Sequence, residues 1–187
     1  MNKILVLAFL SFTVSSTFFN EYLKAQDVDN SREPVTIKSV DLKMYAGLWY
    51  EIAKIPNSFQ NHCKYGTKAE YILREDGNID VINSCYDEEG ELDVAEGLAK
   101  VVDKNSNSKI EVSFVSIFGI HLFWGDYWII GLDKNYEYAI VGHPERKYGW
   151  ILSRTPVLSQ DKLDEAFSIL IAQGYHPGDF EMTEQKN

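Results

Sequence analysis

The segment Gly-Leu-Trp-Tyr-Glu-Ile-Ala at residues 47–53 decides how the rest of the chain can fold. Because side chains alternate along a strand, Trp49, Glu51 and Ala53 share one face of it. Both faces are largely apolar, which predicts that the strand is covered on both sides. Glu51 is the exception, because a buried carboxylate needs a partner or must bind a proton. Whatever covers this face therefore decides what the protein does.

Composition and charge narrow the class of protein. The chain of 187 residues is long enough for one domain preceded by a targeting segment. Aromatic residues make up 13%, which suits either β-rich packing or an aromatic-lined cavity. The formal net charge of −10 argues against a nucleic-acid partner and against binding to an anionic membrane by charge alone. We interpret the acidity as a solvated surface.

The N-terminal segment has the pattern of a secretory signal peptide. Lys3 precedes an uncharged, mostly apolar run over residues 4–19, which is short for a membrane span. We expect cleavage after Ala25, with cleavage after Ser16 and then an uncleaved anchor as the alternatives. Residues 1–25 would then be the signal peptide.

Export would place the chain in the periplasm or outside the cell. In such an oxidising compartment Cys63 and Cys85 are candidates for one disulfide. No cysteine precedes Cys63, so we expect no lipid-anchor cysteine at the new N-terminus. Residues 26–40 are polar without clear periodicity and are interpreted as a linker.

From residue 47 onward, short alternating segments follow one another with turn-forming residues between them. We expect strands at residues 47–53, 68–74, 79–86, 94–103, 109–115, 127–132, 136–143 and 148–154, and a short last strand at 180–183. One helix follows the eighth strand, with Ser159 as its N-cap and Gly174 at its end. The pattern predicts an all-β fold, an eight-stranded antiparallel up-and-down barrel with one C-terminal α-helix, over residues 41–187.

Three motifs along these strands resemble those of the lipocalin family. Gly47-Leu48-Trp49-Tyr50 resembles the Gly-x-Trp hallmark, Gly125-Asp126-Tyr127 the second motif, and Arg154 the third. The longer runs at residues 49–59, 125–130 and 150–156 are similar to the branch that contains the bacterial lipocalin Blc and apolipoprotein D. The resemblance runs from about Val40 to Phe180, and each motif falls on the expected element.

The resemblance implies a barrel with one closed end, where Gly47, Trp49 and Arg154 form the closure. A guanidinium over an indole ring contributes roughly 0.5–2 kcal/mol. It also implies that the loops after the first, third, fifth and seventh strands surround an open mouth. Cys63 and Cys85 both fall there, so a disulfide between them is sterically reasonable. A metal site that adds His62 is the alternative.

Inward-facing positions of such a barrel outline an apolar cavity suited to an acyl chain. The residues that we expect to contact a ligand are Glu51, Ala53, Tyr71, Val81, Asn83, Ala99, Val112, Phe114, Tyr127, Ile129, Val141, Tyr148 and Trp150. The lipid head group would stay at the mouth, where Arg146 and Lys147 are available. Glu51 would pair with Arg154, hydrogen-bond a tyrosine of the cavity or stay protonated.

These features predict a periplasmic or secreted protein, or one associated with an outer membrane, that binds and carries a fatty acid or lysophospholipid. The apolar segment from Ile117 to Trp124 at the mouth either covers the entrance or contacts a membrane. We expect no cofactor and no metal, and the sequence has no enzyme signature. Two alternatives remain: a lipid-modifying enzyme that uses Glu51 or the histidines His121 and His143, and an interaction module. In that module the apolar segment would convert a monomer into a homodimer.

Overall fold

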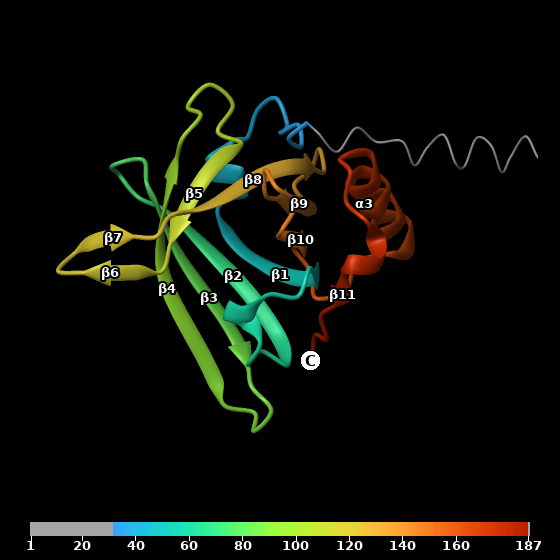
Figure 1. Cartoon of the computed structure of the whole chain (residues 1–187), viewed down its shortest axis with the longest axis horizontal. Coiled ribbons are helices and arrows are strands. Elements are labelled where there is room, and N and C mark those ends of the chain that lie inside the picture. The colour runs from blue at the N-terminus through green and yellow to red at the C-terminus, as the bar shows by residue number, and fades with distance from the viewer. Residues whose placement is uncertain (1–31, 187) are drawn as a thin grey trace, which may run out of the picture.

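Eight strands pair in sequence order in the computed structural model, which describes residues 32–186 (Figure 1). They are β1 (Gly47–Lys54), β2 (Tyr65–Leu73), β3 (Ile79–Tyr86), β4 (Leu92–Val101), β5 (Lys109–Ser113), β8 (Gly125–Leu132), β9 (Tyr138–Gly142) and β10 (Gly149–Ser153). Every pairing is antiparallel, and β10 pairs with β1, which closes the barrel. The predicted eight-stranded barrel is confirmed. The predicted signal peptide lies outside the described residues.

The helix and the last strand also follow the prediction. Helix α3 (Gln160–Ala172) begins after Ser159 and lies against the outside of the barrel, beside β9 and β10 (Figure 1). Its buried residues Ala166 and Leu170 belong to an apolar cluster with residues of β8, β9 and β10. The short strand β11 (Glu181–Met182) pairs with the end of β1, so the C-terminal segment is joined to the barrel. The turn η2 (Pro177–Asp179) connects α3 to β11.

The connection between β5 and β8 differs from the prediction. Where we expected one apolar segment, β6 (Val115–Ile117) and β7 (Ile120–Leu122) form a separate two-stranded hairpin that projects away from the barrel (Figure 1). The barrel strand therefore ends at Ser113, whose hydroxyl donates to the Leu122 carbonyl oxygen at 2.5 Å. No helix among residues 32–186 is long and apolar enough to cross a membrane.

Residues 32–40, which we interpreted as part of a linker, lie along the outside of the barrel, from the end of α3 to the loop between β4 and β5. The Ile37 N–H donates to the Ile129 carbonyl oxygen at 3.0 Å, and the Val40 N–H to the Ser106 carbonyl oxygen at 2.7 Å. The Val40 side chain is buried in the barrel core. Most of these contacts are backbone hydrogen bonds, which do not depend on side-chain type. The polar, aperiodic sequence therefore could not predict them.

Arg154 closes this end of the barrel. Its guanidinium carbon lies 3.7 Å from the centroid of the Trp49 ring, and Trp49 is fully buried. Its two terminal nitrogens donate hydrogen bonds of 2.6–3.1 Å to the backbone carbonyl oxygens of Met44, Tyr45, Ala46 and Leu48. The predicted meeting of Trp49 and Arg154 is confirmed, and burial lowers the pKa of the guanidinium without removing its charge.

The short helix α2 (Leu42–Tyr45) brings its carbonyl oxygens to Arg154. Asp41 caps it, because its carboxylate accepts from the Lys43 N–H at 2.9 Å. Gly47 then adopts φ +92°, a conformation that favours glycine, where an added Cβ would lie 3.6 Å from Arg154 Nη1. The backbone can therefore turn from α2 into β1 directly beside the guanidinium.

Replacing the guanidinium should destabilise the fold. Arg154→Ala leaves four carbonyl oxygens without their donor and removes the cation over Trp49, so we expect a loss of roughly 3 kcal/mol in unfolding free energy and a melting temperature lower by about 10 °C. Thermal unfolding followed by circular dichroism measures this. Arg74→Ala, at an exposed ion pair, is the matched control and should leave the melting temperature nearly unchanged. Equal melting temperatures for Arg154→Ala and the wild type would contradict the closure.

Candidate ligand-binding site

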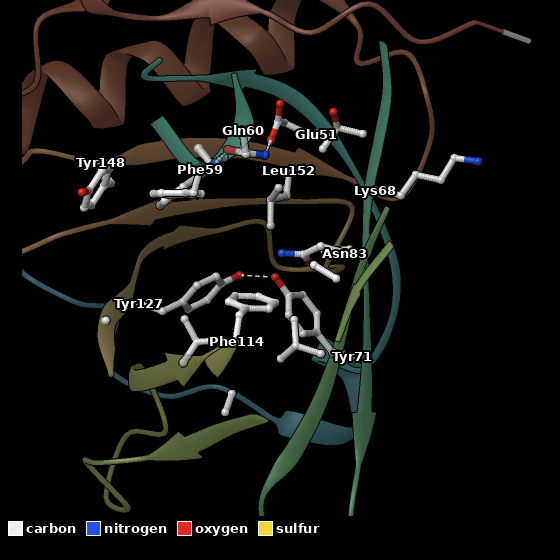
Figure 2. Close-up of a pocket in the computed structure, with 18 of the residues that line it drawn as sticks. Glu51, Phe59, Gln60, Lys68, Tyr71, Asn83, Phe114, Tyr127, Tyr148 and Leu152 are labelled. Carbon is white, nitrogen blue, oxygen red and sulfur yellow. Dashed lines mark hydrogen bonds between the residues drawn. The ribbon is translucent and has the colours of Figure 1, made fainter. Parts of the chain in front are cut away.

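The barrel contains a cavity of about 540 Å³ (Figure 2). This volume lies within the range of small-molecule binding sites. The inward faces of β1, β2, β3, β4, β5, β8 and β10 form its walls, and the loop between β1 and β2 reaches over one side. Most of the lining side chains are apolar or aromatic, so the cavity favours an apolar guest.

Ten of the thirteen residues expected to contact a ligand line this cavity. They are Glu51, Tyr71, Val81, Asn83, Ala99, Val112, Phe114, Tyr127, Tyr148 and Trp150. The other three, Ala53, Ile129 and Val141, are fully buried elsewhere.

The misplacement of Ala53 has a clear structural cause. The pairing of β1 with β10 shifts register between Glu51 and Ala53, so the strict alternation of faces breaks there. Ala53 consequently joins Ile52 in the cluster beneath α3. Ile129 and Val141 do face the barrel interior, but they are part of the core that fills it instead of the cavity wall.

Several cavity residues lie outside the strands that sequence alternation can identify. Tyr45 comes from α2, and Phe59 and Gln60 come from the turn η1 (Ser58–Gln60) in the loop between β1 and β2. The Phe59 ring contacts the Tyr148 ring with a centroid distance of 5.5 Å. Loop residues carry no periodic signal, so only the folded structure shows that they face the cavity.

Three tyrosine hydroxyl groups meet deep in the cavity. The Tyr127 hydroxyl lies 2.7 Å from that of Tyr45 and 3.0 Å from that of Tyr71 (Figure 2 shows the second pair). Tyr45 and Tyr71 are buried, and the Tyr45 ring contacts Trp49 at the closed end with a centroid distance of 5.1 Å. Burial raises the pKa of Tyr71 to about 12 and raises those of Tyr45 and Tyr127 well above the usual value. All three hydroxyl groups are therefore protonated at neutral pH.

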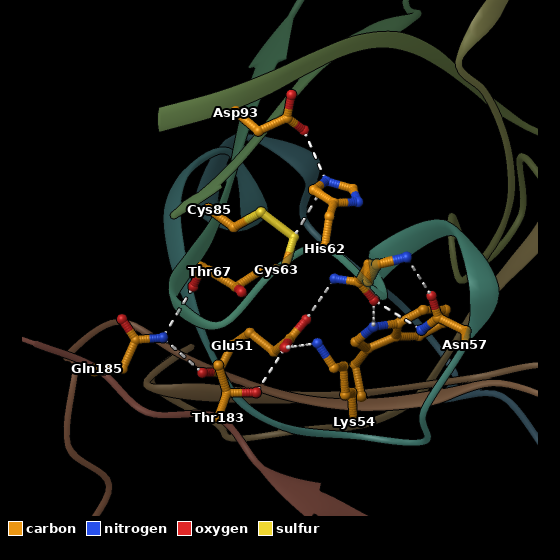
Figure 3. Close-up of a disulfide and its surroundings, with 12 residues drawn as sticks. Glu51, Lys54, Asn57, His62, Cys63, Thr67, Cys85, Asp93, Thr183 and Gln185 are labelled. Carbon is orange, nitrogen blue, oxygen red and sulfur yellow. Dashed lines mark hydrogen bonds and ion pairs between the residues drawn. A yellow bond between two sulfur atoms is a disulfide. The ribbon is translucent and has the colours of Figure 1, made fainter. Parts of the chain in front are cut away.

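Glu51 is held by other groups than those we expected (Figure 3). Its carboxylate accepts from Gln60 Nε2 at 2.9 Å and from the Thr183 hydroxyl at 2.6 Å, and Lys54 Nζ lies 3.4 Å away. Neither Arg154 nor a tyrosine of the cavity bonds to it. Its contacts join β1 to the first loop and to the C-terminal segment, so the buried carboxylate has a structural role.

A disulfide joins the first loop to the end of β3 at the mouth. The Cys63–Cys85 bond spans 22 residues of sequence and is shown in Figure 3, which confirms the predicted pair. His62 lies beside it, with Nε2 2.9 Å from Asp93 Oδ2. The alternative metal site would need the two sulfur atoms that are bonded to each other here.

The two cations that we expected at the mouth are used elsewhere. Arg146 Nε donates to the Gln173 carbonyl oxygen at 2.7 Å, behind α3, and Lys147 pairs with Glu145. Neither residue lines the cavity. The expectation failed because a turn residue next to a barrel strand can point outward, towards the helix, as well as inward.

The hairpin β6–β7 exposes a group of large apolar side chains. Phe118 at its tip is fully exposed, and Ile117, Ile120 and Phe123 are each more than half exposed. Phe118 and Gly119 form the tight turn, with φ of +51° and +79°. Phe123 also lines the cavity, so the hairpin continues the apolar surface of the mouth.

A closed eight-stranded barrel with an apolar cavity and an external helix defines the class of small-ligand-binding β-barrels. The chain belongs to the lipocalin family: residues 40–185 match the model of the lipocalin-like domain. Lipocalins bind small hydrophobic ligands, and this coarse function holds for the family as a whole.

Comparisons with individual proteins agree with this assignment. The chain is 33% identical to temperature-induced lipocalin-1 of Arabidopsis thaliana (83% of this chain, 85% of the relative) and 36% identical to the outer membrane lipoprotein Blc of Escherichia coli K12 (82% and 84%). It is 33% identical to mouse apolipoprotein D, with 82% of each chain covered. Among solved structures, insecticyanin of Manduca sexta superimposes with a TM-score of 0.66 at 25% identity (83% of this chain, 85% of that chain).

Removing the disulfide should weaken the mouth and lower stability. Cys63→Ser/Cys85→Ser frees a loop of 22 residues, and the entropic model gives a loss of about 3 kcal/mol in unfolding free energy. Urea denaturation measures the difference. Reduction of the wild-type protein is the matched control and should give the same loss, whereas an unchanged midpoint in both would show that the bond does not constrain the unfolded chain.

Proposed function

We propose that the protein binds a single-chain lipid, a fatty acid or a lysophospholipid, in the barrel cavity and carries it through an aqueous compartment. The cavity of about 540 Å³, apolar along its walls and open at one end, carries this proposal. Each CH₂ group that leaves water for such a wall contributes about 0.8 kcal/mol. An acyl chain therefore obtains enough burial to bind without a charged partner.

We further propose that this carriage takes place in the periplasm or outside the cell, including at an outer membrane, as part of lipid transport or membrane maintenance. The disulfide at the mouth supports an oxidising compartment. The similarity to an outer membrane lipoprotein and to apolipoprotein D supports a location near lipid.

The hairpin β6–β7 is the proposed membrane contact. Its exposed apolar tip adjoins the cavity mouth, so a lipid could pass between bilayer and barrel without crossing water. Uncharged, aromatic side chains at the tip suit the interface of a bilayer. In this proposal the protein contacts the membrane as a monomer. The alternative is that the same hairpin surface forms the contact of a homodimer.

No feature of the cavity favours the lipid-modifying alternative. Glu51 is held by Gln60, Thr183 and Lys54, so its carboxylate is not available to a substrate. Of the two histidines considered for catalysis, His143 lines the cavity and contacts the Tyr148 ring, whereas His121 lies on β7 of the hairpin and is not among the lining residues. We therefore propose binding without chemistry.

Filling the cavity should abolish lipid binding without unfolding the barrel. Ala99 is buried on the cavity wall, so the ring of Ala99→Phe would occupy space meant for the acyl chain, and we expect at least about tenfold weaker binding of a fluorescent fatty acid. Fluorescence titration measures this. Ala172→Phe, on the exposed face of α3, is the matched control. Equal affinities in both variants and the wild type would place the lipid outside the cavity.

Charging the hairpin tip should remove membrane contact. Phe118→Asp places a carboxylate where the fully exposed ring would enter the bilayer, so co-sedimentation with neutral phosphatidylcholine vesicles should fall at least about fivefold. Val157→Asp changes a similarly exposed apolar residue beyond β10 and should have no effect. Unchanged co-sedimentation of Phe118→Asp would contradict membrane docking, and a loss of dimer in the same variant would identify the hairpin as a subunit contact.

A further inference from the structure

We propose that the guest enters the barrel with its oxygen-bearing end first and that the tyrosine cluster at the floor, Tyr45, Tyr71 and Tyr127, binds its carboxyl group. This inference rests on the proposed function and narrows the ligand to a fatty acid. The zwitterionic head group of a lysophospholipid would have to lose its hydration in an apolar cavity, whereas a carboxyl group is small enough to be satisfied by a few hydroxyl and amide donors.

The tyrosine cluster has more O–H donors than hydrogen bonds between its members. Three hydroxyl groups contain three O–H donors, and two hydrogen bonds join them. Whichever way the protons point, one O–H donor finds no acceptor among the residues that the structure describes. A buried donor left unsatisfied is costly, and a carboxyl oxygen at the floor would accept from it.

Asn83 offers a second donor close to this cluster. Asn83 lies on the inward face of β3 and pairs with Ala69 of β2. Tyr71 lies two residues further along β2 and pairs with Val81. Asn83 is therefore two residues closer to the mouth than the level of Tyr71. Figure 2 shows its carboxamide pointing into the cavity above the bonded hydroxyl groups. Within residues 32–186 no hydrogen bond to this carboxamide is found, so its NH₂ group is available to a guest.

The distribution of charge favours an anion at the floor over an anion at the mouth. Arg154 lies behind Trp49 and acts electrostatically on all three tyrosines, so the floor is in the field of a cation. At the mouth, Asp93 and Asp126 line the cavity. The ammonium group of Lys68 points away from the cavity in Figure 2 and lies over the Tyr50 ring.

The rim of the cavity is suited to hydrocarbon. Phe59, Phe114, Val115 and Phe123 line the cavity and are 41–82% exposed, which places them at its opening. The methyl end of an acyl chain would lie against these side chains and against the apolar hairpin. The closed end of the cavity thus offers uncharged hydroxyl donors, whereas the open end combines large apolar side chains with the carboxylates of Asp93 and Asp126.

Within residues 32–186, one fully buried polar atom of the cavity wall lacks a partner, the hydroxyl oxygen of Thr67. Thr67 lies beside Glu51, because the Gln185 side chain bridges the backbone carbonyl oxygens of both residues. A carboxylate at Thr67 would therefore face the carboxylate of Glu51. This makes the tyrosine cluster the better site for the carboxyl group.

The orientation can be measured on the unaltered protein with two stearic acids, one with a nitroxide near the carboxyl end and one with it near the methyl end. Ascorbate in solution reduces nitroxides that it can reach. We expect the methyl-end label to be reduced at least about tenfold faster in the complex than the carboxyl-end label, because the floor of a cavity is shielded from solutes in water. Faster reduction of the carboxyl-end label would overturn this inference but leave lipid carriage intact. If neither fatty acid binds but a lysophospholipid does, the inference is wrong and lipid carriage stands; if neither kind of lipid binds, both are wrong.

The role of the hydroxyl groups is tested by removing all three. Tyr45→Phe/Tyr71→Phe/Tyr127→Phe replaces a buried hydrogen-bonded group by apolar rings of the same shape, so stability should change little. We expect affinity for stearic acid to fall at least about tenfold, while affinity for diphenylhexatriene, an apolar probe without oxygen, stays the same. Tyr138→Phe, a buried tyrosine beneath α3, is the matched control. Equal losses for both probes, or no loss for stearic acid, would overturn the inference.

Discussion

The contact between Arg154 and Trp49 is the constraint on which the rest of the structure depends. A barrel with eight strands has two ends, and a cavity that holds an apolar guest needs one of them sealed. Here a single guanidinium covers the indole ring and joins four carbonyl oxygens of the segment around α2 to the end of β10. Because that segment is fixed, the Tyr45 side chain lies at the floor of the cavity. Trp49 and Arg154, which belong to the family motifs, therefore also set the depth of the binding site.

Buried polar groups divide the cavity into two regions with different roles. Glu51 near the mouth is fully engaged by Gln60, Thr183 and Lys54, so it stabilises the loop and the C-terminal segment. The tyrosine cluster at the floor is only partly engaged, with one donor to spare. A satisfied group builds the fold and an unsatisfied one is available to a ligand, which is why the deeper cluster, and not the carboxylate, carries the argument about cargo.

The strand pattern and the family motifs predicted much of this molecule. Alternation placed Tyr71, Val81 and Asn83 correctly, because β2 and β3 pair without interruption over these residues. It failed at Ala53, where one extra residue in β1 reverses the faces, since a bulge leaves no mark in a single sequence.

Other parts of the site depend on tertiary contacts. Tyr45 reaches the cavity from a four-residue helix, and Arg146 is directed to the Gln173 carbonyl oxygen by the docking of α3. The hairpin β6–β7 was recognised as apolar, but its separation from the barrel follows from the early end of β5. Such features are set by packing between distant segments, which periodicity does not report.

The central claim is that the closed barrel holds one intact lipid by its acyl chain. Native mass spectrometry of the protein after incubation with a total membrane lipid extract tests it most directly. The account predicts one bound, chemically unchanged single-chain lipid per protein chain, which is absent when the cavity is filled. A protein that emerges without lipid, or with altered product in place of the offered lipid, would contradict it.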